Sequence, residues 1–151
     1  MLSKYAWAIP LKNKRGSTLT EAFEKIFSER TPNFVQTDRG TEFLNVEVQS
    51  MFRERGIRHY FSMNDDIKAA VVERFNRTLK TMMFRYFTHL NTYRWVDVLE
   101  DLMKSYNGTR HRSIGMAPVE VSSSNESKVR DLLYPPKPSP EWKYQVGDTV
   151  R

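Results

Sequence analysis

Short apolar segments that alternate with helix-like segments constrain the fold of this chain more than any other feature. Residues 34–37 and 57–61 are short segments of strand length that contain apolar and aromatic residues. Between them, residues 45–56 carry apolar side chains at helical spacing, with Asn45 placed to cap the helix and Gly56 placed to end it. Strands that alternate with helices predict an α/β domain in which helices pack on a mixed sheet.

The same periodicity predicts further elements on either side. Large apolar residues alternate over residues 5–11, which predicts a strand and a chain that begins inside it. Thr18 and Glu21 have the spacing of a capping box, which predicts the start of a helix. Apolar residues recur every three or four positions in later segments, which predicts helices at residues 69–90, 94–106 and 119–129.

The C-terminal part has a different composition. Four prolines at positions 135, 136, 138 and 140 predict a stiff linker over residues 134–141. Residues 142–151 then read as a strand, a turn and the start of a second strand, which is too little for a stable sheet. We therefore expect one domain over residues 1–133, followed by the linker and the beginning of another module.

Composition excludes several classes of protein. The 151 residues include 39% hydrophobic and 13% aromatic residues, too many for an intrinsically disordered chain. No run approaches the roughly 20 apolar residues that cross a bilayer, so no membrane association is expected. Without cysteine the chain has no disulfide, Cys-ligated zinc or thiol nucleophile. A formal net charge of +6 favours a polyanionic partner.

Two carboxylates occupy positions where catalytic and metal-binding groups are common. Asp38 follows the strand at residues 34–37 and precedes a glycine turn, and ligands gather at such strand ends in α/β folds. Glu73 lies in the first turn of the long helix, where the helix dipole favours a negative charge. Each residue also fits a purely structural role, as a turn former or a dipole partner.

The residues that follow Glu73 extend this pattern. At about 100° per residue, Arg77 and Lys80 lie roughly 40° and −20° from Glu73 around the helix. A carboxylate followed by two cations suits a metal-bound phosphate site, because hard cations bind carboxylate and phosphate oxygens and basic side chains bind nucleic-acid backbones. A surface ion pair between Glu73 and Arg77 fits the same spacing, so both interpretations stay open.

Two ordered motifs in the chain resemble the catalytic core of retroviral-type integrases. They are Gln36-Thr37-Asp38-Arg39-Gly40-Thr41-Glu42-Phe43 and Lys68-Ala69-Ala70-Val71-Val72-Glu73-Arg74-Phe75-Asn76-Arg77-Thr78-Leu79-Lys80. Within that superfamily the chain looks most like the integrases of Maverick/Polinton transposons, through Ser3-Lys4-Tyr5-Ala6-Trp7, residues 72–80, and Tyr106-Asn107 to His111-Arg112-Ser113. The resemblance covers residues 1–133.

This resemblance implies a ribonuclease-H-like fold with an Asp, Asp, Glu triad that binds two divalent metals, Mg²⁺ or Mn²⁺. Asp38 matches the second acidic ligand and Glu73 the third. The implied activity is polynucleotidyl transfer on DNA, in which element ends are trimmed and then joined to target DNA. A homo-oligomer in the nucleus is implied as well, and residues 142–151 look like the opening of an SH3-like or chromodomain-like barrel.

The resemblance also implies where DNA is bound. Arg77 and Lys80 match helix positions that contact DNA in the family. Arg74, Arg110 and Arg112 contribute to the basic excess in the long helix and the later turn, so we expect them to bind DNA too.

The chain departs from the family pattern in two respects. The separation of the two carboxylates, 73 − 38 = 35, leaves 34 residues between them, one fewer than usual, and the difference fits a shorter loop at residues 61–68. The first Asp of the family lies upstream of the Ser3-Lys4-Tyr5 segment, whereas no acidic residue here precedes Glu21. We therefore expect a core without its first strand and a poor or inactive catalyst. Glu42 could substitute, although a solvent-facing turn residue fits it better.

Three functions stay open at this point. The chain is the catalytic core of a transposon or retrovirus-like integrase, or a relic domain that binds nucleic acid without catalysis, or another ribonuclease-H-like nuclease. An acidic strand encoded upstream would favour the first, and strand transfer with element-end DNA would separate the first from the third.

Overall fold

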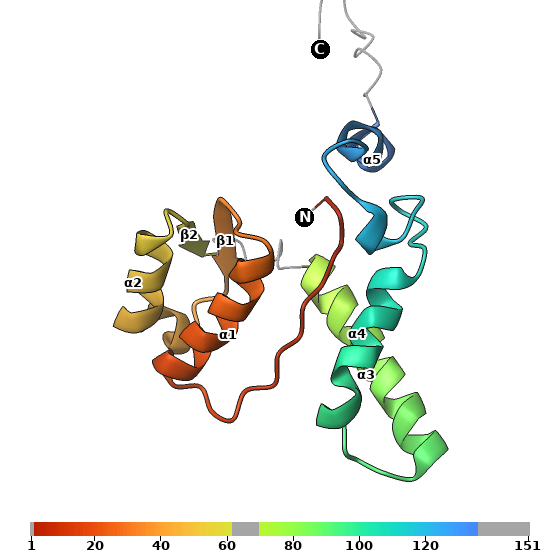
Figure 1. The fold of residues 1–151 in the computed structure, drawn as a ribbon, viewed down its shortest axis with the longest axis horizontal. Coiled ribbons are helices and arrows are strands. Elements are labelled where there is room, and N and C mark those ends of the chain that lie inside the picture. Colours follow the sequence, from red (N-terminus) through yellow and green to blue (C-terminus); the bar gives the residue numbers. More distant parts are fainter. Residues whose placement is uncertain (1, 62–69, 136–151) are drawn as a thin grey trace, which may run out of the picture. The chain divides into compact units, whose positions relative to one another are not determined.

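The computed structural model describes residues 2–61 and 70–135, the coloured part of the ribbon in Figure 1. The chain divides into two compact units. One unit holds residues 6–106, and the other combines the N-terminal residues with the chain from Asn107 onward. Most of the loop expected at 61–68, most of the proline-rich linker and the strand-like tail at 142–151 lie outside the described residues.

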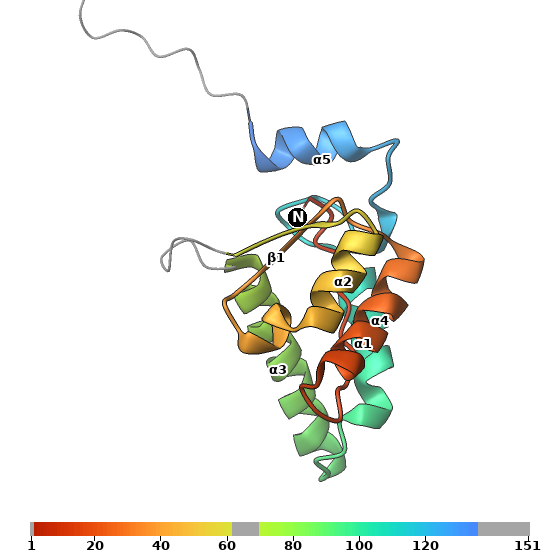
Figure 2. The ribbon, with the colours of Figure 1, turned by 90° about the vertical axis from the view of Figure 1, so that its left-hand side faces the viewer.

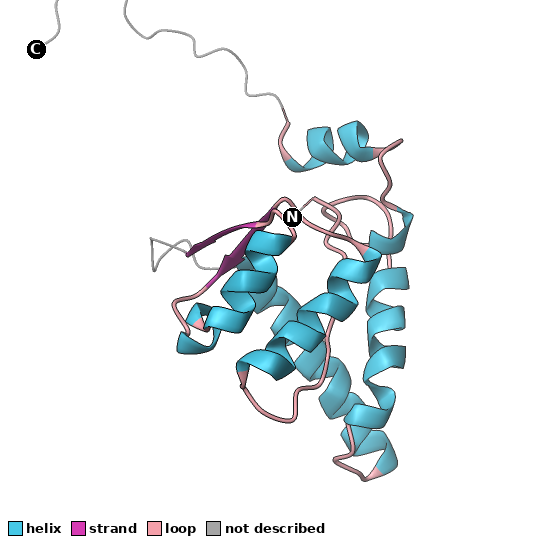
Figure 3. Ribbon diagram, turned by 60° about the vertical axis from the view of Figure 1, so that its left-hand side comes forward, coloured by secondary structure: helices cyan, strands magenta, loops and turns pink. Residues whose placement is uncertain are grey.

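The sheet in the described residues has two parallel strands, β1 (Phe34–Thr37) and β2 (Arg58–Phe61) (Figure 3). Phe34 pairs with Arg58 and Thr37 with Phe61, so the C-terminal ends of both strands meet at one edge. Both strands lie where the sequence predicts them. The expected mixed sheet is represented in this part of the chain by the parallel pair alone.

Helix α2 (Val46–Glu54) connects the two strands, as parallel pairing requires. The predicted cap is confirmed, because the Asn45 side chain accepts a hydrogen bond of 2.9 Å from the Glu47 amide. Gly56 has a φ of +68° just beyond the helix, a left-handed conformation that glycine adopts without strain. A single 3₁₀ turn, η1 (Thr41–Leu44), precedes α2 and was not predicted.

The core of the larger unit forms where α1 (Gly16–Glu29), α2 and the strands pack together (Figure 2). Phe52 is buried at its centre, and its ring meets that of Phe23 edge-on at 5.3 Å and that of Phe27 at 6.3 Å. The buried members of this cluster are Leu19, Phe27, Val48, Met51, Phe52 and Ile57. This packing fixes the positions of β1 and β2, and so of their C-terminal ends.

Helix α1 corrects the predicted start of the first helix. It begins at Gly16, ahead of the expected capping box, and Thr18 donates to the Asn13 side chain instead of capping an amide. Asn13 Oδ1 also accepts from the Arg15 amide, so this one oxygen organises the turn that enters the helix.

The predicted strand at residues 5–11 is also wrong. In the structure this segment is irregular, and within residues 2–61 and 70–135 β1 pairs with β2 and not with it. Alternating apolar side chains become a strand only beside a partner backbone. Lys4 has a φ of +56°, and Trp7 is held by its side chain, which donates to Glu29 Oε2 at 2.9 Å.

Two further helices complete the larger unit. Helix α3 (Ala70–Leu90) agrees with the longest predicted helix, whereas the predicted helix at 94–106 is a 3₁₀ turn, η3 (Val96–Val98), followed by α4 (Leu99–Gly108). Helices α3 and α4 lie side by side (Figure 1), and the rings of Phe75 and Tyr106 meet edge-on at 4.9 Å. Among the described helices, none has the length and apolar character that a membrane crossing needs.

The smaller unit has its own core, formed by Ile114, Val121 and Val129. The helix predicted at 119–129 is instead a 3₁₀ turn, η4 (Pro118–Glu120), and a later helix, α5 (Glu126–Leu133). Asn125 causes the interruption, because its side chain accepts from the Ser122 amide and donates to the Glu120 carbonyl.

Candidate metal and nucleic-acid site

Asp38 lies directly after β1, as predicted, and its side chain is exposed. The carboxylate closes a tight turn in which its Oδ1 accepts a hydrogen bond of 3.1 Å from the Gly40 amide. The turn holds the carboxylate at the end of the strand.

Glu42 approaches the same turn from η1. A Cβ placed on Gly40 would lie 2.6 Å from Glu42 Oε2 and 3.1 Å from Asp38 Oδ1, so both carboxylates lie over this glycine. Lys14 Nζ contacts Glu42 Oε1 at 3.2 Å. A hydrogen bond from its own backbone amide, and secondarily Lys14, lowers the pKa of Glu42. Glu42 is therefore held in an ion pair beside the turn, with its side chain 22% exposed.

A chain of hydrogen bonds ties the end of β1 to β2 and α2. The Gln49 amide nitrogen donates to the Phe43 carbonyl at 2.7 Å and lies 2.8 Å from His59 Nδ1. Because that nitrogen is only a donor, Nδ1 accepts and His59 carries its proton on Nε2. His59 Nε2 then donates to Thr37 Oγ1 at 2.9 Å, and Thr37 donates to the Asp38 carbonyl at 2.8 Å.

His59 is held between aromatic rings as well. Its ring centroid lies 4.9 Å from that of Phe52 and 4.7 Å from that of Phe61. Burial among these groups lowers the pKa of His59 below its usual 6.5, which favours the neutral ring that the hydrogen bonds require. Sequence reasoning missed this network because its members are 10 and 22 residues apart and no motif links them.

The predicted basic residues of the long helix share its exposed side. Glu73 lies in the first turn of α3, followed by Arg74, Arg77 and Lys80, and all four side chains are exposed. In the two stretches that the structure describes, none of the three cations has an ion-pair partner, so the alternative of a Glu73–Arg77 surface pair is not observed. Their positive charge is therefore available to a ligand.

Arg110 and Arg112 belong to the smaller unit, at a turn closed by the bridge between His111 and Met116. Arg110 has a structural task there, since its Nε donates to the Gly115 carbonyl at 2.9 Å. Arg112 is exposed. Their role in DNA binding stays a prediction.

The residues predicted to bind metal fit a hard divalent cation by their chemistry. Asp38 and Glu73 are exposed carboxylates at the end of a strand and the start of a helix, and carboxylate oxygens are the ligands that Mg²⁺ prefers. Across residues 2–61 and 70–135, no three His, Cys, Asp or Glu side chains gather around one point that a metal could occupy. The structure thus supplies two candidate ligands, and Glu42 does not complete a three-residue set with them.

Comparison with curated proteins finds related sequences, one of which is described as transposon-derived. The chain is 37% identical over 143 residues to a transposon-derived protein of Caenorhabditis elegans, which covers 93% of this chain and 48% of that protein. The chain therefore spans about half the length of this relative. No protein-family model matches the chain.

Solved structures with a similar fold include integrase catalytic cores. The core domain of BIV integrase matches with a TM-score of 0.68 and 18% identity, over 83% of this chain and 82% of that one. The HTLV-2 integrase core, solved with magnesium in a trimeric form, matches with a TM-score of 0.63 and 20% identity, over 73% and 71% of the two chains. An intasome of simian T-cell lymphotropic virus, in complex with a PP2A regulatory subunit, matches with a TM-score of 0.66 and 18% identity, over 93% of this chain and 48% of that one.

These identities are low, so the structural matches establish the fold and not the activity. They confirm the predicted ribonuclease-H-like fold and the resemblance to retroviral integrases, while the finer assignment to Maverick/Polinton elements stays a prediction. The chain therefore has the ribonuclease-H-like fold of retroviral integrase catalytic cores and is similar in sequence to a transposon-derived protein.

Proposed function

We propose that this chain is the catalytic-core portion of an integrase-type polynucleotidyl transferase that binds DNA and acts with a divalent cation. The observation that carries the proposal is the exposed side of α3, where Glu73 is followed by Arg74, Arg77 and Lys80. Within residues 2–61 and 70–135 these three cations have no ion-pair partner, so they repel one another, and a phosphate backbone would relieve that repulsion.

In this proposal Asp38 and Glu73 hold Mg²⁺ or Mn²⁺ through their carboxylate oxygens. When bound, the cation would activate a water or a DNA 3′-hydroxyl and stabilise the leaving oxygen. The Gly40 amide keeps the Asp38 carboxylate turned toward the strand end. Arg77 and Lys80 bind the strand that carries the reacting phosphate, through contacts that position DNA without reading its sequence.

The finer activity that we propose is DNA 3′-end processing followed by strand transfer, carried out by a homo-oligomer in the nucleus. Three similarities support it: the magnesium and trimeric form of the HTLV-2 integrase core, the simian virus intasome, and the transposon origin of the Caenorhabditis elegans relative. The first acidic ligand of integrases has no counterpart ahead of Glu21 in these residues. We therefore propose DNA and metal binding as the activities to measure first.

Salt-dependent binding of duplex DNA tests the cationic surface of α3. Each phosphate contact contributes about −0.9 to the slope of log affinity against log salt. The double variant Arg77→Ala/Lys80→Ala should weaken binding and reduce the magnitude of the slope by about 1.8. Lys25→Ala, which removes an exposed cation from α1, is the matched control and should leave the slope unchanged.

Two outcomes would contradict this proposal. A double variant with the affinity and slope of the wild type would show that α3 does not bind the backbone. Titration of the wild type with Mn²⁺, followed by electron paramagnetic resonance, should give saturable binding that both Asp38→Asn and Glu73→Gln weaken. These amides keep the shape of each side chain and remove its charge. If both variants bind Mn²⁺ as tightly as the wild type does, the two carboxylates are not ligands.

A further inference from the structure

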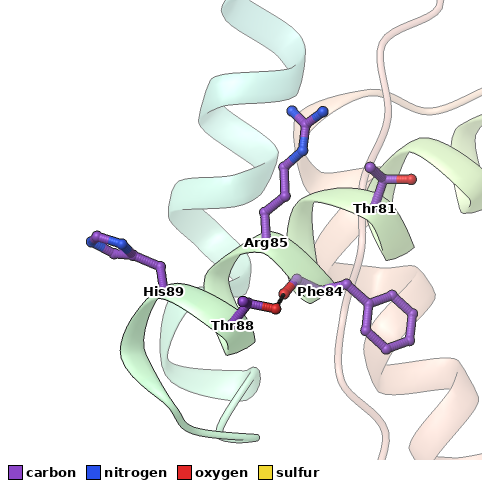
Figure 4. A pocket seen from close by; sticks show the side chains of 5 residues that line it. All are labelled: Thr81, Phe84, Arg85, Thr88 and His89. Atoms are coloured by element: carbon purple, nitrogen blue, oxygen red, sulfur yellow. Dashed lines mark hydrogen bonds between the residues drawn. The ribbon is translucent and has the colours of Figure 1, made fainter.

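On the C-terminal side of Arg77 and Lys80, one exposed aromatic side chain interrupts the polar surface of α3. Phe84 is 64% exposed, far more than a phenyl ring needs to be on a helix that packs against a neighbour. It lies on a shallow, open surface together with Thr81, Arg85, Thr88 and His89 (Figure 4).

The ring of Phe84 is braced by its neighbours rather than loosely exposed. Phe87 meets it edge-on, with ring centroids 6.1 Å apart and planes at 82°, and Tyr93 packs on Phe87 at 5.6 Å. The hydroxyls of Thr81 and Thr88 donate to carbonyls of the helix itself, as Figure 4 shows for Thr88 and Phe84. The surface around Phe84 therefore combines an aromatic ring held by its neighbours with hydroxyls that already donate hydrogen bonds within the helix.

The position of Phe84 on the helix connects it to the proposed DNA-binding residues. It follows Arg77 by seven residues and Lys80 by four, which places it about 20° and 40° from them around the helix. From residue 74 to the end of α3 the sequence contains no acidic residue, and Arg85 is exposed beside Phe84. The surface is thus cationic and aromatic along one side of the helix.

The cations and the aromatic ring on this side of α3 favour a nucleic-acid strand over a second copy of the chain as the ligand. A second copy of the chain, placed face to face on this side of α3, would bring like charges together, which is unfavourable. A single nucleic-acid strand offers both complements, since its phosphates neutralise the cations and its bases stack on an aromatic face. Stacking is tolerant of sequence because every base has a π-face.

We propose that Phe84 is a stacking platform for an unpaired base of the DNA strand whose phosphates lie on Arg77 and Lys80. The inference rests on the proposed function and adds a site for single-stranded DNA to it. Phe84 follows Glu73 by eleven residues, a rise of about 16 Å along the helix. At about 3.4 Å per nucleotide, the stacked base lies four to five nucleotides from the Glu73 carboxylate.

Fluorescence of 2-aminopurine, which falls when the base stacks, tests the proposal with the full chain. The probe occupies one position at a time in the single-stranded overhang of a short DNA duplex. The wild type should quench the probe at one or two adjacent positions. Phe84→Ala should remove that quenching and weaken overhang binding by about five- to 150-fold, and Phe84→Trp should retain both.

The control is Leu90→Ala, which shortens another exposed apolar side chain of α3, about 120° around the helix from Phe84. It should bind the overhang as the wild type does. Phe84→Ala should keep the salt slope of the wild type, because it removes no phosphate contact, and should bind blunt duplex normally.

Each other outcome overturns a defined part of the proposal. If Arg77→Ala/Lys80→Ala reduces the salt slope but Phe84→Ala binds the overhang like the wild type, DNA binding stands and the stacking platform is wrong. If the wild type binds no DNA, both proposals fail. If Phe84→Ala leaves DNA binding intact and converts an oligomer into a monomer in size-exclusion chromatography, the surface is a contact between copies of the chain.

Discussion

At the scale of single residues, the end of β1 depends on a neutral His59. Its Nδ1 accepts from Gln49, whose nitrogen also donates to the Phe43 carbonyl, so a proton on Nδ1 would face a donor. The groups that pack against it in the described structure, Phe52, Phe61, Thr37 and Gln49, carry no charge that could stabilise the cation. Acidification should therefore weaken the hydrogen bonds that hold the end of β1, which Asp38 directly follows.

The lowered pKa of His59 predicts a dependence of stability on pH. In the unfolded chain the pKa of His59 is 6.5, and in the folded protein it is lower. Between these two values the unfolded state binds more protons than the folded state, so acid favours unfolding. The contribution of neutral His59 to stability should therefore be complete above about pH 6.5. The free energy of unfolding should fall as the pH drops from 6.5 toward the folded pKa. Urea denaturation at pH 7.5 and at steps down to pH 5 measures it.

The variant His59→Phe provides the control. It keeps an aromatic ring between Phe52 and Phe61, lowers stability at pH 7.5 through the lost hydrogen bonds, and should show a flatter pH profile over the same range. Glu42 and Glu100, whose pKa values are lowered by hydrogen bonds and nearby lysines, lose their contributions only below about 4.5. Parallel profiles for variant and wild type would assign the dependence to another group.

At the scale of elements, the start of α1 and the cap of α2 depend on each other. A Cβ on Gly16 would lie 2.5 Å from Asn45 Oδ1, the oxygen that accepts from the Glu47 amide and caps α2. Alanine usually stabilises a helix by about 1 kcal/mol relative to glycine. Here Gly16→Ala should instead lower the free energy of unfolding by about 1 kcal/mol, because it displaces the cap.

A double-mutant cycle measured by urea denaturation isolates this dependence. Asn45→Ala alone should lower the free energy of unfolding by about 1 kcal/mol. In that background Gly16→Ala meets no amide side chain and should no longer destabilise, so the two variants should be non-additive by about 1–2 kcal/mol. Strict additivity would mean that the helix start and the cap are independent.

These elements also show what the sequence could predict. Both strands, α3, and the cap and end of α2 follow from patterns read over a few consecutive residues, and the structure confirms them. The strand at residues 5–11 failed because strand formation depends on a partner backbone that periodicity does not reveal. The capping box at Thr18 failed because Asn13, five residues earlier, binds the Thr18 hydroxyl.

The candidate site could likewise be predicted from the sequence only in part. Asp38 and Glu73 were predicted from a strand end and a helix start, which are local features, and the structure places them there. The approach of Glu42 to Asp38 over Gly40, and the network through His59, join residues from separate elements. No spacing rule predicts such contacts, because the packing of α1, α2 and the strands brings these residues together.

At the scale of the whole molecule, the described residues contain two cores with no shared member. Ile57 is buried with Phe52 in the larger unit, and Ile114 is fully buried with Val121 and Val129 in the smaller one. Ile57→Val and Ile114→Val each remove one buried methylene, which should lower the free energy of unfolding by about 0.5–1.5 kcal/mol. Urea denaturation followed by tryptophan fluorescence and by circular dichroism measures each loss.

The double variant shows how the two cores contribute to one folded state. Because no side chain belongs to both clusters, the losses should add to within about 0.5 kcal/mol. If the units unfold together, both probes give one transition and the full sum. If they unfold separately, Ile114→Val shifts only the transition of its own unit. A loss that differs from the sum by more than 1 kcal/mol would show that the cores are energetically coupled, so that the segment carrying Arg110 and Arg112 stabilises the unit that carries Asp38 and Glu73.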